Sequence, residues 1–428
     1  MGSDIMRLPY RGGNWNNGAN AGLAALNLNN SRVNTNTNIG FRPAFGSSQK
    51  ATPHGALSSA LSKGCRCLGY RRKTEQAAPV RRAADFKALM YDQIISFDNL
   101  HQAALRCLCG KRTSPAALRY MQRLEEHLHD THNHLLHDSY QPGGYEEFYV
   151  FEPKQRLISA PRFVDRVVHR AIMNVLEPTL DPRFIFDSYA CRKGKGVHAG
   201  ANRAQCWMRA IRQAHGPLFC LKADISKYFA SIDHARLKAI LRRHIHCDRT
   251  LRLLDAIIDS SPGRPGVGIP LGNLTSQLFA NLYLNELDRY AKHDLGIRYY
   301  IRYMDDFVVL HHDKAQLQAW RARIEQFLWS ALRLTTNSKT QIFPVGPDNG
   351  RALDFLGYRI YPTHRLLRKN SIKRIRYKLR RFKRAIAAGR LTAGDCRPCI
   401  QSWCAHAAHA NTWRLRCSLF NISSGANR

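Results

Sequence analysis

Acidic residues are scarce in this sequence of 428 residues. It contains 31 Asp and Glu against 66 Lys and Arg, which gives a formal net charge of +35. Such an excess of positive charge is typical of proteins that bind a polyanion, most often the phosphate backbone of a nucleic acid. Composition alone leaves two classes open, an enzyme that acts on nucleic acid and a structural binder of the ribosomal kind.

Long hydrophobic runs are also missing. No stretch approaches the roughly 20 apolar residues that cross a membrane, and the start, MGSDIMRLPY, lacks the apolar core of a signal peptide. We therefore expect a cytoplasmic protein with no membrane partner and with reduced cysteines. A cluster near the C-terminus has the residue types of a zinc site, but its spacing is poor and the surrounding pattern is helical, so buried thiols and imidazoles are the simpler interpretation. The cluster comprises Cys396, Cys399, Cys404, His406 and His409.

The first 80 residues differ from the rest. Between Asn14 and Asn38, 10 of 25 residues are Asn, and no helical or strand period runs through the segment. We expect residues 1–80 to be a largely disordered tail and linker. From residue 81 onward, helical patterns and strand-like runs alternate up to about Tyr361, which predicts an α/β core.

The C-terminal part has a helical and strongly basic pattern. Five apolar residues between Ile372 and Ile386 are spaced three and four apart, which predicts one apolar stripe on a helix. From Arg365 to the end there are 16 Lys and Arg and one acid, Asp395. One face of this helix should dock on the protein, and the other suits a phosphate backbone.

Two adjacent acids stand in the turn of a predicted hairpin. Strands at 297–303 and 307–311 flank Asp305 and Asp306, where a plain turn favours Asn-Gly or Asp-Gly. Adjacent carboxylates repel each other, so a bound divalent metal explains them better. Polymerases use two metal ions about 4 Å apart, and Mg²⁺ is expected because a few protein carboxylates and substrate phosphates suffice to hold it. Asp224, at the end of a buried strand, is the expected third ligand.

Several motifs resemble those of reverse transcriptases, and they follow one another along the chain in the family's order. Tyr303-Met304-Asp305-Asp306 is similar to their Tyr-x-Asp-Asp motif, and the segment from Asp224 to Asp233 is similar to their first catalytic motif, with Phe229 at the aromatic gate. The resemblance implies a right-hand polymerase, with fingers and palm (antiparallel sheet plus helices) in residues 81–365 and a basic α-helical thumb in 366–428. It also implies RNA-directed DNA polymerase activity with two Mg²⁺ per active site.

The resemblance assigns roles to residues motif by motif. It implies metal ligation by Asp224, Ile225, Asp305 and Asp306; a general-acid role for Lys339; nucleotide contacts by Lys154, Arg156, Arg192, Phe229, Leu271, Gly272, Ser276 and Gln277; and primer or template contacts by Tyr303, Phe355, Leu356, Gly357, Arg376 and Arg380.

Two positions point to a subtype. Group II intron and retron enzymes typically carry Gln where this chain has Leu271, and Ser-Pro where it has Ser276-Gln277. The reverse transcriptases of diversity-generating retroelements, which are bacterial or phage-encoded, resemble this chain at both points. Gln can hydrogen-bond near the incoming nucleotide and Leu cannot, so we expect error-prone copying. The resemblance implies that the errors fall at adenines and diversify a target gene. The implied partners are template RNA, nascent cDNA, deoxynucleoside triphosphates and a small basic accessory variability protein.

The N-terminal segment supports the same subtype. The stretch from Tyr10 to Arg42 resembles the variable end of the C-type-lectin-like targets of these retroelements. We hypothesise that residues 1 to about 50 are translated template repeat. The alternatives are an unrelated Asn-rich tail, an ordinary retron or group II intron enzyme, and a catalytically inactive RNA-binding scaffold; the complete set of three aspartates argues against the scaffold.

Overall fold

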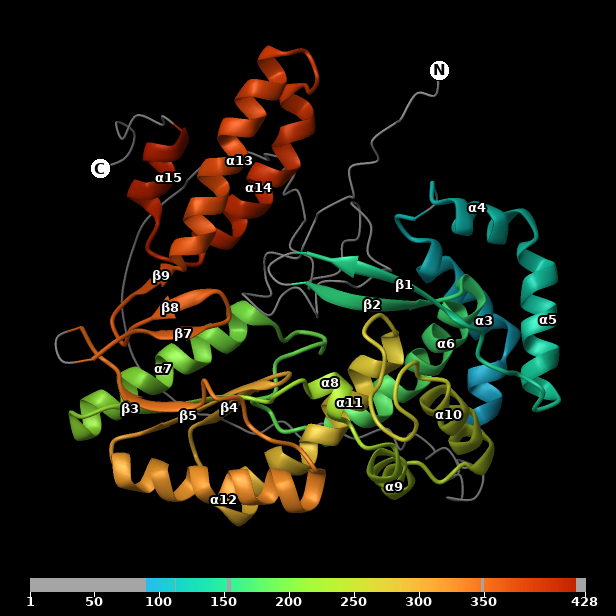
Figure 1. Cartoon of the computed structure of the whole chain (residues 1–428), viewed down its shortest axis with the longest axis horizontal. Helices are drawn as coiled ribbons and strands as arrows, with labels where there is room; N and C mark the ends of the chain where they lie inside the picture. The colour runs from blue at the N-terminus through green and yellow to red at the C-terminus, as the bar shows by residue number, and fades with distance from the viewer. Residues whose placement is uncertain (1–89, 112, 152–154, 348–349, 421–428) are drawn as a thin grey trace, which may run out of the picture.

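The computed structural model describes residues 90–111, 113–151, 155–347 and 350–420. The predicted tail and linker at 1–80, the hypothesis of a translated repeat and the predicted contact of Lys154 all lie outside the described residues. The chain folds as helices around antiparallel sheets, and the right-hand arrangement predicted from the sequence is confirmed (Figure 1).

The palm is built on a four-stranded antiparallel sheet in the order β4-β5-β3-β6. The first five residues of β5, from Asp306 to Leu310, are buried, as expected of a central strand. Figure 1 shows α12 below these strands and the small β7-β8-β9 sheet above them. The palm elements are α7 (Val197–His215), β3 (Phe219–Asp224), α8 (Tyr228–Ser231), α11 (Leu274–Arg289), β4 (Tyr300–Tyr303), β5 (Asp306–His311), α12 (Lys314–Leu332), β6 (Gln341–Pro344), β7 (Leu353–Phe355), β8 (Tyr358–Ile360) and β9 (Arg365–Leu367).

The fingers combine helices with one two-stranded hairpin, β1-β2, whose strands pair from Tyr145–Pro161 to Val150–Arg156. α6 packs against α3 and α11 and so joins the fingers to the palm. The elements are α3 (Phe97–Leu108), α4 (Pro115–Gln122), α5 (Leu124–Leu136), β1 (Tyr145–Val150), β2 (Arg156–Pro161), α6 (Phe163–Leu180), η2 (Asp181–Arg183), α9 (His234–His244) and α10 (Asp248–Asp259). The short helix η3 (Tyr290–Asp294) continues α11 of the palm.

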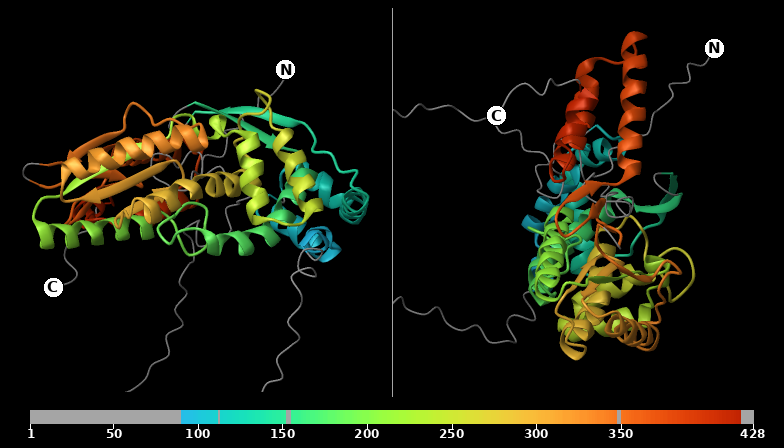
Figure 2. Two further views of the ribbon diagram at one scale, coloured as in Figure 1. Left: turned by 90° about the horizontal axis from the view of Figure 1, so that it is seen from below. Right: turned by 90° about the vertical axis from the view of Figure 1, so that its left-hand side faces the viewer.

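The thumb is the helical pair α13 (Lys369–Ala387) and α14 (Ala393–Ala408), followed by α15 (Trp413–Phe420). It stands upright at the end of the β7-β8-β9 sheet (Figures 1 and 2). The apolar stripe of α13 is only partly covered: Ile375 is buried, whereas Ile386 is 42% exposed. Among the helices that the structure describes, none combines the length and apolar content needed to cross a bilayer.

One local prediction from the sequence is wrong. A proline inside a helical pattern predicts that the helix ends there, because proline lacks the N–H that bonds to the fourth preceding carbonyl, and Pro178 follows such a pattern. Instead α6 continues through Pro178 to Leu180. Packing of α6 against α3 and α11 outweighs the lost hydrogen bond.

Candidate active site

The two adjacent aspartates lie at the β4-β5 turn. Tyr303 pairs with Asp306, so Met304 and Asp305 form a two-residue turn. Met304 has φ of +55°, a conformation that disfavours residues with a Cβ. Such backbone strain persists only where surrounding contacts stabilise it, so the turn needs supporting contacts from the residues packed beneath it.

Arg302 holds this turn from below. Its side chain is fully buried and forms an ion pair with Asp288 of α11, with a closest N–O distance of 2.6 Å. Its Nη1 donates to the Met304 carbonyl at 3.0 Å and to Oδ1 of Asn281 at 3.2 Å. The guanidinium therefore ties the strained residue to α11 and fixes the direction in which Asp305 leaves the sheet.

Three carboxylates converge at this edge of the sheet. Asp224, the last residue of β3, is the cross-strand partner of Asp306. The backbone N–H of Ile225 donates to the Asp305 carbonyl at 3.1 Å, which closes the turn onto the end of β3. Asp224, Asp305 and Asp306, predicted from segments about 80 residues apart in the chain, are thus brought together.

The electrostatics of the cluster are those of crowded, desolvated acids. Burial, reinforced by the charge of Asp224, raises the pKa of Asp305 to about 7. Burial likewise raises the pKa of Asp306 to about 6, although Lys222 opposes the shift with its Nζ 3.6 Å from Oδ2. Oδ1 of Asp306 is buried and accepts no hydrogen bond. A cation at this place would relieve both the repulsion and the unsatisfied oxygen.

The donor set fits a divalent metal ion held jointly with substrate. Within the described ranges, no group of three or more His, Cys, Asp or Glu is gathered closely enough to hold a metal by itself, and this includes the cysteines and histidines of α14. Mg²⁺ usually keeps few protein ligands and completes its shell with water and phosphate oxygens. Asp224, Asp305, Asp306 and the Ile225 backbone are the groups placed to contribute, and such an ion would polarise phosphate and the attacking hydroxyl.

Arg156 and Lys339 are the two cations predicted to act at the cluster. Arg156 begins β2 and feels the charges of Asp305 and Asp224, while burial lowers its pKa. Its buried Nη1 makes no hydrogen bond, so the guanidinium has a free donor beside the carboxylates. Lys339 is exposed and follows Asn337, whose backbone N–H donates to the Asp224 carbonyl at 2.7 Å.

A loop joins the aromatic gate to the fingers. The N–H of Ile269 donates to the Phe229 carbonyl at 2.8 Å, and the N–H of Ser159 in β2 donates to the Leu271 carbonyl at 3.0 Å. Gly272 has φ of +136°, and a Cβ there would lie 2.6 Å from the Ser159 carbonyl oxygen. The loop with Ile269, Leu271 and Gly272 therefore links Phe229 of α8 to β2.

Other predicted nucleotide contacts are placed less directly. Ser276 is buried and Gln277 half-buried in the first turn of α11. Arg192 is buried, with Nε 2.6 Å from Asp181 and Nη1 donating to the carbonyls of Ile185 and Ser188. Its donors are engaged within the protein, so this side chain braces the loop before α7.

The predicted primer contacts divide between the palm and the thumb. Phe355 pairs with Tyr358, so Leu356 and Gly357 form a second two-residue turn, with φ of +53° and +87°. Phe355 is fully buried. Tyr303 is buried in β4, next to the turn that carries Asp305. On the thumb, Arg376 and Arg380 are exposed on α13.

Sequence reasoning missed the groups that support the carboxylates. These are Arg302, Asp288, Lys222 and Asn337. Arg302 had a signal: it is a charged residue inside the strand run that leads into Met304, and such a residue is buried only when it is paired. Asn337 had none, because its contact with Asp224 spans 113 positions.

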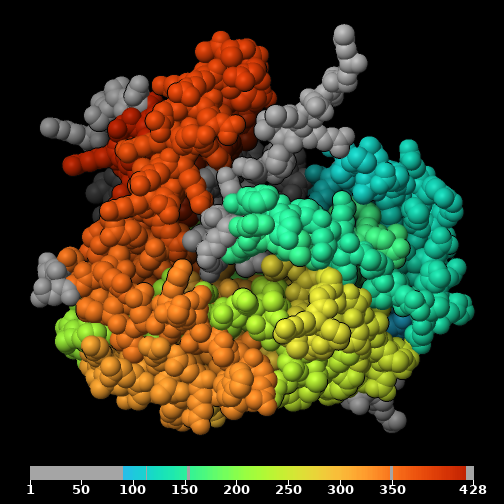
Figure 3. Space-filling model, viewed as in Figure 1, coloured from blue at the N-terminus to red at the C-terminus, as the bar shows by residue number. Residues whose placement is uncertain are grey.

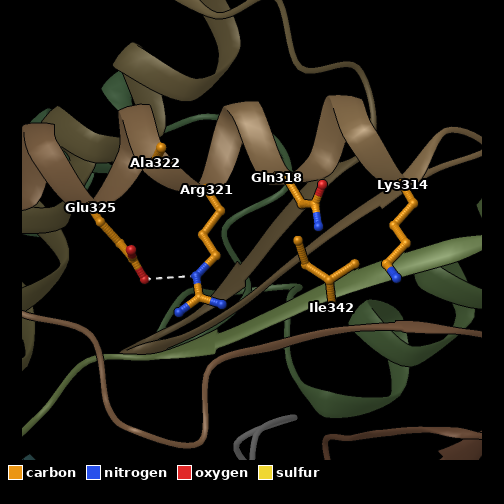
Figure 4. Close-up of a pocket in the computed structure, with 6 residues that line it drawn as sticks. All are labelled: Lys314, Gln318, Arg321, Ala322, Glu325 and Ile342. Atoms are coloured by element: carbon orange, nitrogen blue, oxygen red, sulfur yellow. Dashed lines mark hydrogen bonds and ion pairs between the residues drawn. The ribbon is translucent and has the colours of Figure 1, made fainter.

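The thumb and the β1-β2 hairpin stand on two sides of the palm (Figure 3). A separate groove of about 500 Å³ lies between α12 and β6 (Figure 4). None of the three carboxylates lines this groove, so it is distinct from the candidate active site. Its lining residues are Lys314, Gln318, Arg321, Ala322, Glu325 and Ile342.

Known proteins share this region. Residues 151–360 match the family of reverse transcriptases (RNA-dependent DNA polymerases). Protein YkfC of Escherichia coli (strain K12) is 29% identical over 290 residues, which cover 58% of this chain and 73% of that protein. The group II intron-encoded protein LtrA of Lactococcus lactis subsp. cremoris is 24% identical over 166 residues, 37% of this chain and 27% of LtrA.

Solved structures of related shape were also found. An apo telomerase from Candida tropicalis, truncated from its C-terminal domain, has a TM-score of 0.43 and 11% identity, covering 52% of this chain and 55% of that one. A partial Cas6-RT-Cas1–Cas2 complex has a TM-score of 0.34 and 17% identity, covering 56% and 42%. The range matched by the family contains all three carboxylates, the gate and the second turn.

Proposed function

We propose that the whole protein copies a template RNA into cDNA with two Mg²⁺ ions. The premise is that this chain carries a reverse transcriptase domain over residues 151–360. The observation that carries the proposal is the convergence of Asp224, Asp305 and Asp306 at one edge of the palm, with the pKa of both turn aspartates raised by burial. A scaffold that only bound RNA would have no use for this repulsive cluster.

Each predicted residue has a task in that reaction. The three carboxylates and the Ile225 carbonyl would hold the metal ions, which supply the charge that activates the primer hydroxyl and binds the leaving pyrophosphate. Arg156, with its unsatisfied Nη1, would bind the triphosphate. Lys339, exposed beside Asp224 through Asn337, would donate a proton to the leaving group. Lys154 and Gln277 stay predicted nucleotide contacts.

The test is primer extension by the full chain on RNA transcribed from the DNA that neighbours its own gene, with Mg²⁺ and deoxynucleoside triphosphates. The matched comparison is the Asp305→Asn variant. We expect product from the wild type and none from Asp305→Asn, while RNA binding by the variant stays near normal. Equal extension by both proteins would refute the assignment of the active site. RNA binding without extension by the wild type, with or without accessory protein, would favour the scaffold.

We further propose that copying is error-prone at adenines and serves to diversify a target gene, together with a small basic accessory protein. Leu271 supports this, because its carbonyl is fixed to Ser159 and its apolar side chain offers no hydrogen bond to the new base pair. Leu271→Gln should lower misincorporation opposite adenine in sequenced products. An unchanged error spectrum would leave the ordinary group II intron or retron type of activity as the better interpretation; the 24% identity to LtrA favours keeping that alternative.

A further inference from the structure

An exposed phenylalanine marks a surface that the polymerase chemistry does not use. Phe186 is 65% exposed, the highest fraction among the large hydrophobic side chains of the described residues. It lies in the loop between η2 and α7. Two residues later Ser188 pairs in parallel with Arg302, so this loop extends the palm sheet at its β4 edge. An exposed aromatic ring on an ordered edge of the sheet leaves apolar surface in contact with water.

Two cations flank this ring. Nζ of Lys195 lies 3.3 Å from the centroid of Phe186 and donates to the Phe186 carbonyl at 2.9 Å. The guanidinium of Arg203 lies 5.3 Å from the same ring and 4.8 Å from the ring of Trp207. Both lie within the range of cation–π attraction, so rings and cations alternate along the loop and α7, with the Phe186 ring exposed and the Trp207 ring buried.

The alternation continues toward the start of β4. Lys292 of η3 lies 5.4 Å from the Trp207 ring, and Trp207 meets Tyr299 edge-on at 5.6 Å. Arg298 lies 5.3 Å from the Tyr299 ring and is exposed. We call this contiguous set the aromatic ladder; it consists of Phe186, Lys195, Arg203, Trp207, Lys292, Arg298 and Tyr299.

The ladder has more positive charge than its acids neutralise. Asp187 alone is shared by Arg203, at 3.0 Å, and Lys292, at 3.5 Å. Burial and the nearby charge of Arg192 lower the pKa of Lys195. Lys195 and Arg298 form no ion pair with an acid among the contacts found in the described residues. An added anion would therefore be stabilised here.

We propose that the aromatic ladder binds a single-stranded segment of RNA. Rings interleaved with Lys and Arg are the combination that holds unpaired nucleotides, because bases stack on the rings while the cations contact phosphates. Phe186 and Tyr299 offer the partly exposed rings, and Arg298 and Lys195 the phosphate contacts. A duplex keeps its bases stacked on each other and gains less from such a surface.

The position of the ladder says which part of the RNA it holds. Tyr299 precedes β4, whose other end carries the catalytic turn; four residues of strand span about 13 Å. The bound segment is therefore not the template base being copied but a stretch that flanks it. That the RNA is a template rests on the proposed function, whereas the binding itself does not.

The experiment uses the full chain and a labelled, unstructured 20-nucleotide RNA in a fluorescence anisotropy titration. The ladder variant is Phe186→Ala with Arg298→Asn. The matched control is Trp329→Ala with Arg333→Asn, an exposed ring and cation 5.4 Å apart on α12, outside the ladder. We expect the ladder variant to bind about tenfold more weakly and the control to bind nearly as well as the wild type. The slope of the logarithm of affinity against the logarithm of salt concentration should be shallower by about one in the ladder variant, because one fewer cation contacts the phosphates.

Equal affinities of the ladder variant and the control for the single-stranded RNA would overturn the proposal. It would also be overturned if the ladder variant lost as much affinity for a blunt RNA duplex as for the single strand, because that would indicate a general charge effect. Phe186→Trp should retain binding, because any large ring provides a stacking face. Extension of a primer–template too short to reach from the carboxylates to the ladder should be unchanged in the ladder variant. Failure of the wild type to extend any primer would refute the polymerase proposal and leave the anisotropy comparison valid.

Discussion

Gly272 offers a sharp test of how the nucleotide-facing loop is built. Gly272→Ala adds a methyl group 2.6 Å from the Ser159 carbonyl oxygen at a residue with φ of +136°. Gly263→Ala is the matched control: its φ is +113°, but a Cβ there meets nothing within 4 Å. Both substitutions carry the backbone strain of a positive φ, about 1–3 kcal/mol, and only Gly272→Ala adds a clash with backbone.

The clash sets the size of the expected difference. Overpacking of this kind costs about 1–3 kcal/mol, so Gly272→Ala should lower the free energy of unfolding by that much more than Gly263→Ala. The Ser159–Leu271 hydrogen bond must then lengthen, and the loop must move away from β2. A shift of about 1 Å in a positioning group reduces the rate of the chemical step up to a hundredfold.

Two measurements check this reasoning. Urea denaturation of both variants gives the stability difference, and single-turnover primer extension, well below the unfolding midpoint, gives the rate. We expect Gly263→Ala to extend primers at nearly the wild-type rate and Gly272→Ala to extend them at least tenfold more slowly. Equal destabilisation by the two substitutions, or a wild-type rate for Gly272→Ala, would refute the close approach of this loop to β2.

Three further predictions concern the supports of the site. Tyr358→Phe removes the hydroxyl that lies 2.9 Å from His198 Nδ1 and 3.1 Å from His406 Nδ1; urea denaturation should show a loss of about 1–3 kcal/mol, because buried ring nitrogens lose their partner, and an unchanged midpoint would contradict this. Burial lowers the pKa of His406 to about 4, so its neutral form stabilises the fold fully above about pH 6.5, and this contribution is lost as the pH falls toward 4. The urea denaturation midpoint should therefore fall less steeply with falling pH in His406→Gln than in the wild type, and an identical pH profile would argue against this. Arg302→Met should lower the unfolding free energy by about 3–5 kcal/mol, because Asp288 is left as a buried unpaired charge, and Arg302→Met with Asp288→Asn should recover much of that; additive losses in the double variant would disprove the pairing.

Local signals in the sequence predicted the elements that end at clear boundaries. A helical pattern between two glycines predicts a helix at 197–215, and α7 runs from Val197 to His215 with Gly196 and Gly216 at its two ends in positive φ. The hairpin with Asp305 and Asp306 followed from two apolar runs around a carboxylate pair. The apolar positions of α10 repeat every three or four residues, so this helix too was open to prediction.

What the sequence could not supply were contacts made across long separations. The strands of the β7-β8-β9 sheet are three residues each, too short for a periodic pattern, and they form because they pair with one another. The position of Asn337 beside Asp224, and the engagement of Arg192 by Asp181, depend on how distant segments meet. Motif matching named Arg192 but could not show that its donors are used within the protein.

The β1-β2 hairpin has a consequence for motion. It is a sheet of only two strands, and Glu146, Glu147 and Tyr149 of β1 are exposed, whereas most of β2 is buried. Two-stranded sheets are marginally stable in water, so β1 should open at much lower free energy than the palm strands. Amide hydrogen exchange would then be fast in β1 and slow in β5, and slowing of β1 exchange on adding nucleotide and RNA would report directly when the fingers engage their substrate.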